Sequence, residues 1–128
     1  MSRILVIDDD ADFRAMARRL LEEEGHEVIE AGTGSEGIEM FRALQPDVIV
    51  TDIFMPGKSG VETIMQIREE STSVRIIAVS GNGGIAAGDI LGSALRAGAN
   101  QTLAKPFPMR QFVDAVQDDK STGGGQSR

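Results

Sequence analysis

Short apolar runs alternate along the chain with segments in which apolar residues recur every three or four positions. The first run, residues 4–7, is continuous and rich in branched side chains, which is typical of a strand buried on both faces of a parallel sheet. The next segment spaces its apolar side chains as one face of a helix, and Gly25 stands where that helix would end. These apolar residues are Phe13, Met16, Ala17, Leu20 and Leu21. The chain is therefore expected to begin with a strand and a helix.

The same alternation recurs to the end of the chain. Further strands are predicted at residues 28–29, 48–50, 76–79 and 102–104, and further helices at about residues 35–44, 60–70 and 90–97, with a last helix that begins at Pro108. Thr33 and Glu36 have the spacing of a capping box. Strands that alternate with helices in this way predict an α/β sandwich around a parallel sheet. We expect a flavodoxin-like fold with five helices and a five-stranded sheet of order 2-1-3-4-5.

The length of the chain fits one domain. Its 128 residues, 41% of them hydrophobic, suffice for a single core. We expect the domain to occupy residues 1–119 and the Gly- and Ser-rich residues 120–128 to form a disordered tail, because they offer no apolar group to bury. The N-terminal apolar run is too short for a signal peptide or a membrane span. We therefore expect a cytoplasmic protein that does not contact a membrane.

Charge and residue types exclude several kinds of chemistry. The chain has 20 acidic and 13 basic residues and a formal net charge of −7, which disfavours direct binding to nucleic acid and favours a cation or a basic partner. It has no cysteine, so disulfides, thiol nucleophiles and thiolate metal sites are excluded. His26 is the only histidine, and it follows Gly25 in a helix-to-strand turn, where we expect a solvated loop side chain.

Acidic residues follow the two strands between which the predicted strand order reverses. Ligands bind at this point in open α/β sheets, beyond the carboxyl ends of the strands. Asp8 and Asp9 follow the first strand and Asp52 follows the third, and neighbouring strands lie about 4.8 Å apart. We expect the three carboxylates to converge. Such a group raises carboxylate pKa values or recruits a cation, and its oxygen ligands suit Mg²⁺, with Mn²⁺ as an alternative.

A hydroxyl and an ammonium group complete the candidate site. Ser80 ends the fourth strand, and Lys105 follows the fifth on a side chain long enough to reach the carboxylates. This set can hold a phosphoryl group: the carboxylate of Asp52 would attack phosphorus, Lys105 and the metal would offset charge, and Ser80 would donate a hydrogen bond. Asp10 or Asp12 is expected only to cap the helix that follows.

At this point the residues resemble the receiver domain of two-component response regulators, from Arg3 to about Asp118. The matching segments are residues 4–10, residues 48–56 with Gly60, residues 78–80 and residues 105–107. The resemblance implies a signalling domain that catalyses only its own phosphorylation and dephosphorylation. It implies that a sensor histidine kinase, a histidine-containing phosphotransfer protein or a small donor such as acetyl phosphate gives its phosphoryl group to Asp52, and that a conformational switch then controls an unidentified downstream protein.

The resemblance also implies details of the site. Asp9, Asp52 and the backbone carbonyl of Phe54 would hold Mg²⁺, with Asp8 acting partly through water. The peptide bond between Lys105 and its following proline would be cis. Either a monomer or a weak, phosphorylation-dependent dimer through the fourth helix, fifth strand and fifth helix fits the family.

Three features depart from the family pattern. The position three residues before Lys105, where the family has an aromatic that rotates inward, is Thr102. Residues 81–88 are unusually rich in glycine, so we expect a mobile loop beside the site. Phe54, two residues after Asp52, places an apolar side chain where it could hinder the water that hydrolyses an aspartyl phosphate, which predicts a long-lived phosphoryl state.

Three alternatives remain open in the sequence. Residues 32–37 match the GxGxxG pattern of dinucleotide-binding domains, with Asp52 about 20 residues further on, although this reading gives Asp8 and Lys105 no role. Asp8 and Asp10 also have the Asp-x-Asp spacing of haloacid-dehalogenase-type phosphatases, but further acidic residues on a strand are missing. An inactive receiver used only for docking is the third alternative, and the complete acidic set disfavours it.

Overall fold

The structure, a computed structural model, describes residues 2–55, 57–81 and 87–117, and of residues 87–89 only the backbone. The expected tail at residues 120–128 lies outside the described residues, and so does most of the glycine-rich segment 81–88 that was expected to be a mobile loop.

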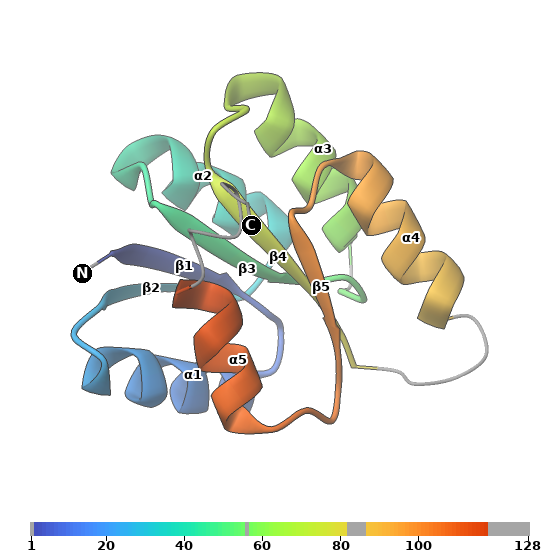
Figure 1. Cartoon of the computed structure of the whole chain (residues 1–128). Coiled ribbons are helices and arrows are strands. Elements are labelled where there is room, and N and C mark those ends of the chain that lie inside the picture. The colour runs from blue at the N-terminus through green and yellow to red at the C-terminus, as the bar shows by residue number, and fades with distance from the viewer. Residues whose placement is uncertain (1, 56, 82–86, 118–128) are drawn as a thin grey trace, which may run out of the picture.

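Five parallel strands form one sheet in the order β2-β1-β3-β4-β5, as predicted (Figure 1). The strands are β1 (Arg3–Ile7), β2 (Glu27–Ala31), β3 (Val48–Asp52), β4 (Arg75–Ser80) and β5 (Gln101–Ala104). The helices are α1 (Ala11–Glu23), α2 (Gly34–Leu44), α3 (Gly60–Glu70), α4 (Ala87–Ala97) and α5 (Met109–Gln117). The flavodoxin-like fold expected from the sequence is thereby confirmed.

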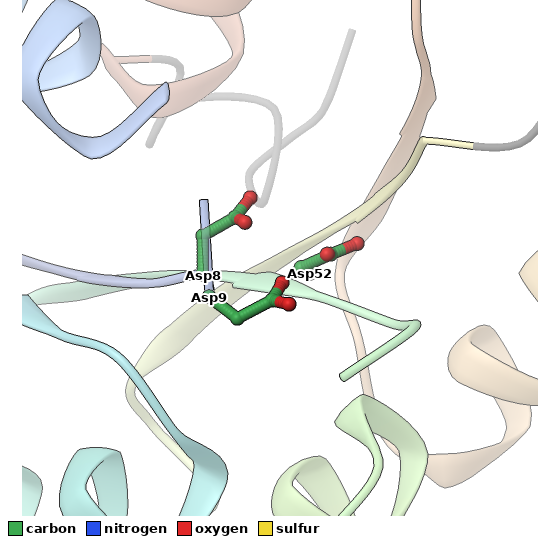
Figure 2. Close-up of side chains that lie close together, drawn as sticks. All are labelled: Asp8, Asp9 and Asp52. Atoms are coloured by element: carbon green, nitrogen blue, oxygen red, sulfur yellow. The ribbon is translucent and has the colours of Figure 1, made fainter. Parts of the chain in front are cut away.

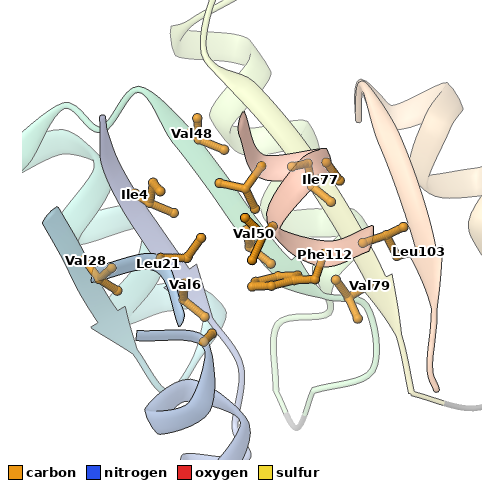
Figure 3. Packing of buried hydrophobic residues seen from close by; sticks show 14 of the residues in the cluster. Ile4, Val6, Leu21, Val28, Val48, Val50, Ile77, Val79, Leu103 and Phe112 are labelled. Atoms are coloured by element: carbon orange, nitrogen blue, oxygen red, sulfur yellow. The ribbon is translucent and has the colours of Figure 1, made fainter. Parts of the chain in front are cut away.

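Helices cover both faces of the sheet. Helices α1 and α5 lie on one face, and α2, α3 and α4 lie on the other (Figure 1). Alternate residues of β1 face the two layers, with Ile4 and Val6 toward α1 and α5 and Leu5 and Ile7 toward the other helices. Figure 3 shows the first of these layers, in which Phe112 of α5 lies against β-strand valines. All four β1 residues are fully buried, which explains why the run is continuously apolar.

The central strands extend beyond the apolar runs that predicted them. The third strand was expected at residues 48–50, but β3 continues through Thr51 to Asp52, which pairs in register with Val79 of β4. Polar residues carry no apolar signal, so the sequence pattern placed the strand end too early. The consequence is that Asp52 is fixed by the sheet itself.

Helix α1 has the expected ends. The side chain of Asp10 accepts hydrogen bonds from the amides of Asp12 and Phe13, which confirms Asp10 as the cap. After the helix, Gly25 adopts a φ of +92°, a left-handed conformation that glycine enters without steric cost. The predicted start and end of this helix are both confirmed.

The capping box was placed on the wrong helix. Thr33 does accept a hydrogen bond from the amide of Glu36, but the Glu36 carboxylate accepts from the amide of Gly32 and so does not complete the box. A complete capping box occurs at α3, where Ser59 and Glu62 exchange backbone and side-chain hydrogen bonds. Helix α4 also starts earlier than predicted, at residue 87 and not 90, because glycine and alanine give no apolar periodicity there.

His26 is not the solvated side chain that was expected. It is half-buried; its Nδ1 accepts a hydrogen bond from the amide of Ser2 at 3.0 Å, and its Nε2 lies 2.9 Å from the side-chain oxygen of Gln117. The histidine thereby links the start of the chain to the end of α5 at the pole opposite the candidate site.

Arg68 joins three elements at that same pole. It extends from α3 and donates hydrogen bonds to the carbonyls of Ser71, Val74 and Gly98 and to the side chain of Asn100. The same Asn100 oxygen accepts a hydrogen bond from the amide of Ile76, the second residue of β4, at 2.8 Å. The C-terminal end of α4 is thereby tied to the ends of α3 and β4.

Gly60 allows a close approach of α3 to the end of β3. A Cβ atom at Gly60 would overlap the carbonyl oxygen of Asp52 and lie 2.6 Å from the Cα of Ile53, and both are backbone atoms that cannot rotate away. We predict that Gly60→Ala lowers the free energy of unfolding by about 1–3 kcal/mol, measured by urea denaturation.

Gly92 provides the matched control for that substitution. It lies within α4, and a Cβ atom there meets only the end of the flexible Arg96 side chain, at 3.4 Å. Gly92→Ala is expected to be neutral or to stabilise by about 0.5–1 kcal/mol. Equal effects of the two substitutions would contradict the packing role assigned to Gly60.

Candidate functional site

Three carboxylates meet where β1 and β3 end. Asp8 and Asp9 follow β1, and Asp52 is the last residue of β3. Figure 2 shows the three side chains gathered at this edge, and one carboxylate oxygen from each lies within 4.8 Å of the others. The amide of Asp8 donates to the carbonyl of Ala31 at 3.1 Å, which holds this loop onto the end of β2. The convergence expected from the strand order is confirmed.

Two of these carboxylates are removed from solvent. Asp8 is 1% exposed and Asp52 is 7% exposed, whereas Asp9 is exposed. One Asp8 oxygen accepts a hydrogen bond from the amide of Asp10 at 2.9 Å, and one Asp52 oxygen lies 3.4 Å from the amide of Phe54. In the described part of the chain, these two amides compensate only part of the buried charge.

Burial and mutual repulsion alter the acidity of the pair. Burial, followed by the charge of Asp8, raises the pKa of Asp52 from 3.8 to about 6, and Lys105 offsets this only in part. Burial also raises the pKa of Asp8. Buried carboxylates that repel one another bind either protons or a cation, and an oxygen-only donor set fits a hard divalent ion. The site is thus chemically suited to Mg²⁺ or Mn²⁺ near neutral pH.

Lys105 follows β5 and reaches the three carboxylates across the end of β4. Its amide donates to the carbonyl of Ser80 at 2.8 Å, and its Nζ lies 3.4 Å from the carboxylate of Asp8. The Lys105–Pro106 peptide bond is cis, as the sequence led us to expect. The ammonium group is therefore close enough to influence charge on both buried carboxylates.

The other predicted residues lie around the same edge. Ser80 is fully buried at the end of β4. This strand lies between β3, which ends in Asp52, and β5, which leads to Lys105. The Phe54 side chain is 44% exposed beside Asp52. Thr102 is half-buried in β5 and pairs in register with Ala78. Ser80, Phe54 and Lys105 thus lie with the three carboxylates at the carboxyl ends of the strands, whereas Thr102 lies two residues before the end of β5.

One contact at the site was missed by the sequence analysis. The Nζ of Lys105 lies 4.1 Å from the centre of the Phe13 ring. Phe13 was assigned only to the apolar face of the first helix. The one signal that could have found it is its place in the first turn after the acidic loop.

The GxGxxG segment has a packing role. A Cβ atom at Gly37 would overlap the side chain of Ile7, and one at Gly34 would overlap that of Thr63. The amide of Gly32 is already occupied by the carboxylate of Glu36, at 2.7 Å. These glycines let α2 approach β1 and α3, and the filled space leaves no cradle for a pyrophosphate. The dinucleotide-binding alternative therefore lacks its central feature.

The raised pKa of Asp52 predicts how the stability of the metal-free protein depends on pH. The folded state holds the proton more tightly than the unfolded state, so this contribution is complete below pH 3.8 and is lost as the pH rises to about 6. Asp52→Asn removes the buried charge. We predict that, without divalent cations, it raises the free energy of unfolding by about 1–3 kcal/mol near pH ~7.5, and that the gain fades near pH ~4.

The prediction is tested by urea denaturation across this range, with Asp114→Asn as the control. Asp114 is an exposed carboxylate in an i,i+4 ion pair with Arg110, so its removal should change stability by less than about 0.5 kcal/mol at any pH. A gain for Asp52→Asn that did not depend on pH would show that the carboxylate charge is not its cause.

Comparisons with known proteins agree with this geometry. Residues 4–117 match the response regulator receiver domain. The chain is 33% identical over 116 residues to the chemotaxis protein CheY of Halobacterium salinarum, covering 91% of this chain and 94% of that protein. A crystal structure of a response regulator receiver domain protein from Clostridium thermocellum has a TM-score of 0.84 and 30% identity, and covers 92% of this chain and 93% of that one.

A third similar structure was determined with ligands. It is that of the response regulator TrrA from Thermotoga maritima in complex with Mg²⁺-BeF, with a TM-score of 0.80 and 31% identity; it covers 91% of this chain and 97% of TrrA. Among the described residues of the present chain, no helix is both long and apolar enough to cross a membrane. From the matched residues, the sheet order and the acidic edge together, the chain belongs to the response regulator receiver domains of two-component signalling and is similar to CheY.

Proposed function

We propose that Asp52 is the phosphoacceptor of this receiver domain. The observation that carries the proposal is the carboxylate triad, in which Asp52 is buried, fixed in register by β3 and close to both Asp8 and Asp9. Of the three, Asp52 alone lies on a strand, between the acidic loop and the strand that leads to Ser80. A nucleophile held in this way needs little reorganisation before it attacks.

The same carboxylates would hold a divalent cation. We assign Asp8, Asp9, Asp52 and the backbone carbonyl of Phe54 as its ligands, with Mg²⁺ favoured and Mn²⁺ as an alternative. The donor chemistry supports this assignment, and the similar TrrA structure contains Mg²⁺ together with a beryllium fluoride. When bound, the cation would neutralise charge on the phosphoryl oxygens.

The transfer step needs only the residues already described. A carboxylate oxygen of Asp52 forms a new bond to phosphorus while the bond from phosphorus to the donor breaks; with acetyl phosphate the leaving group is acetate, and no proton has to move. Lys105 offsets negative charge on the phosphoryl oxygens, and the Ser80 hydroxyl donates a hydrogen bond to one of them. Hydrolysis of the aspartyl phosphate requires a water molecule to reach the same phosphorus.

In the cell the donor would be a sensor histidine kinase or a histidine-containing phosphotransfer protein, and the product state would act on a downstream protein. The net charge of −7 suits a basic partner surface better than nucleic acid. Self-phosphorylation and self-dephosphorylation are the only catalysis that we assign to the acidic site.

Phosphorylation of Asp52 is tested with acetyl phosphate and Mg²⁺. We expect the protein to gain the mass of one phosphoryl group, in a linkage that is stable to acid and labile to base. Asp52→Asn should gain none, whereas Asp114→Asn, which alters an exposed carboxylate of α5, should label like the wild type. Chelation of the metal should abolish labelling. Equal labelling of Asp52→Asn would refute the assignment.

The position of Phe54 predicts the lifetime of the phosphoryl group. The backbone amide of Phe54 faces the Asp52 carboxylate at 3.4 Å, and its exposed side chain is an apolar obstacle to an attacking water. Phe54→Asn supplies a polar group that can orient water, so we predict a several-fold shorter half-life of the label. Decay is followed by mass spectrometry after removal of the donor.

Met65 gives a control for that substitution. It is an exposed apolar side chain on α3, so Met65→Asn makes a similar change of polarity away from the acidic triad. Its label should decay at the wild-type rate. A half-life that Phe54→Asn left unchanged would show that water access at this position does not limit hydrolysis.

A further inference from the structure

Lys105 is held between an acidic group and an aromatic ring. Its Nζ lies 3.4 Å from a carboxylate oxygen of Asp8 and 4.1 Å from the centre of the Phe13 ring. The second distance is well inside the range of a cation–π interaction, which extends to about 6 Å. The ring therefore attracts the ammonium group at the position from which it faces the buried carboxylates.

Phe13 is itself fixed in place. It lies in the first turn of α1, where its amide is bound by the side chain of Asp10, and only 8% of the residue is exposed. Its ring meets that of Phe112 edge to face, with centroids 5.9 Å apart, and Phe112 in turn stacks on Phe107. Three rings from α1, α5 and the segment between β5 and α5 thus support the surface on which Lys105 rests.

The lysine needs such support because its side chain is long and partly solvated. The Lys105 side chain is 24% exposed. Its stem also passes Gly81, where a Cβ atom would lie 3.6 Å from Cδ and 3.8 Å from Nζ. An unrestrained ammonium on a four-carbon stem spends much of its time in water. An aromatic ring in contact with the Nζ favours the conformation in which the ammonium group lies at the acidic site over the one in which it points into water.

We propose that Phe13 is a positioning residue for the phosphorylation reaction, acting by holding the Lys105 ammonium at the acidic site before the donor arrives. The inference rests on the proposed role of Asp52 as phosphoacceptor. It adds that the rate of phosphoryl transfer depends on the aromatic face at residue 13, and not only on the apolar volume that a buried core residue supplies.

The test compares Phe13→Leu with Phe13→Tyr. Leucine keeps an apolar side chain without a π face, and tyrosine keeps the face. We expect Phe13→Leu to slow labelling by acetyl phosphate and Mg²⁺ about three- to tenfold, as loss of a partly desolvated cation–π contact implies. Phe13→Tyr should remain within about twofold of the wild type, by the same reasoning. Equal slowing in both variants would overturn the proposal.

Phe41→Leu controls for the loss of a buried ring. Phe41 lies in α2, in the core layer on the opposite face of the sheet, and is as buried as Phe13. Both leucine variants should lose stability to urea, but only Phe13→Leu should label slowly. If Phe41→Leu labels equally slowly, general loosening of the core explains the effect and the positioning role is wrong.

Two further measurements separate positioning from structural damage. Mg²⁺ binding without donor, followed by NMR titration, should be unchanged or slightly tighter in Phe13→Leu, because the carboxylates stay in place while a competing ammonium is released; weakened binding would indicate a damaged site. The Lys105 Cε protons should show an upfield ring-current shift in the wild type and in Phe13→Tyr, and lose it in Phe13→Leu.

The outcomes distinguish this inference from the proposed function. A wild-type protein that takes no label would overturn the role of Asp52. A wild-type protein that takes label at the same rate as Phe13→Leu would leave that role intact and overturn only the positioning role of Phe13. Absence of the ring-current shift in the wild type would also overturn it, independently of any activity.

Discussion

The structure depends on one unfavourable interaction, the burial of two like-charged carboxylates at the end of the sheet. Asp8 and Asp52 are each more than nine-tenths buried, and the exposed Asp9 adds a third charge beside them. Among the described residues, the amides of Asp10 and Phe54 and the ammonium group of Lys105 compensate part of this charge. Because positive charge is lacking here, a bound cation or a close Lys105 ammonium group stabilises the site. The unfavourable burial of the carboxylates is therefore the source of the site's affinity for a cation.

The fold provides the rigidity that such a site requires. The parallel sheet buries β1 and β3 on both faces, and the apolar layers of α1 with α5 and of α2, α3 and α4 hold them from either side. Asp52 is part of the hydrogen-bonded ladder, and Gly60 lets α3 close over the backbone next to it. Asp52 is therefore fixed by the ladder, and the hydrogen bond from the Asp8 amide to Ala31 holds the loop with Asp8 and Asp9 beside it.

Sequence patterns predicted the strand order and the converging residues because both follow from the alternation of apolar runs and the polar residues that end them. Asp8, Asp52 and Lys105 could be placed together from strand order alone. The partner of the Glu36 carboxylate could not, since it depends on the exact backbone geometry ahead of α2. Nor could the ring beside Lys105, which depends on side-chain directions between elements far apart in the sequence. The GxGxxG pattern could be disfavoured only because it gave Asp8 and Lys105 no role, since glycines needed for helix packing and glycines needed to bind a phosphate look alike until the neighbouring atoms are known.

Arg68 restricts how α4 can move relative to the rest of the domain. By bonding the carbonyl of Gly98 and the side chain of Asn100, it pins the C-terminal end of α4 to α3 and to the start of β4, far from the acidic edge. A helix pinned at one end can pivot but not slide. Any rearrangement of α4 would therefore have to keep its C-terminal end in place or break the hydrogen bonds that Arg68 donates to Gly98 and Asn100.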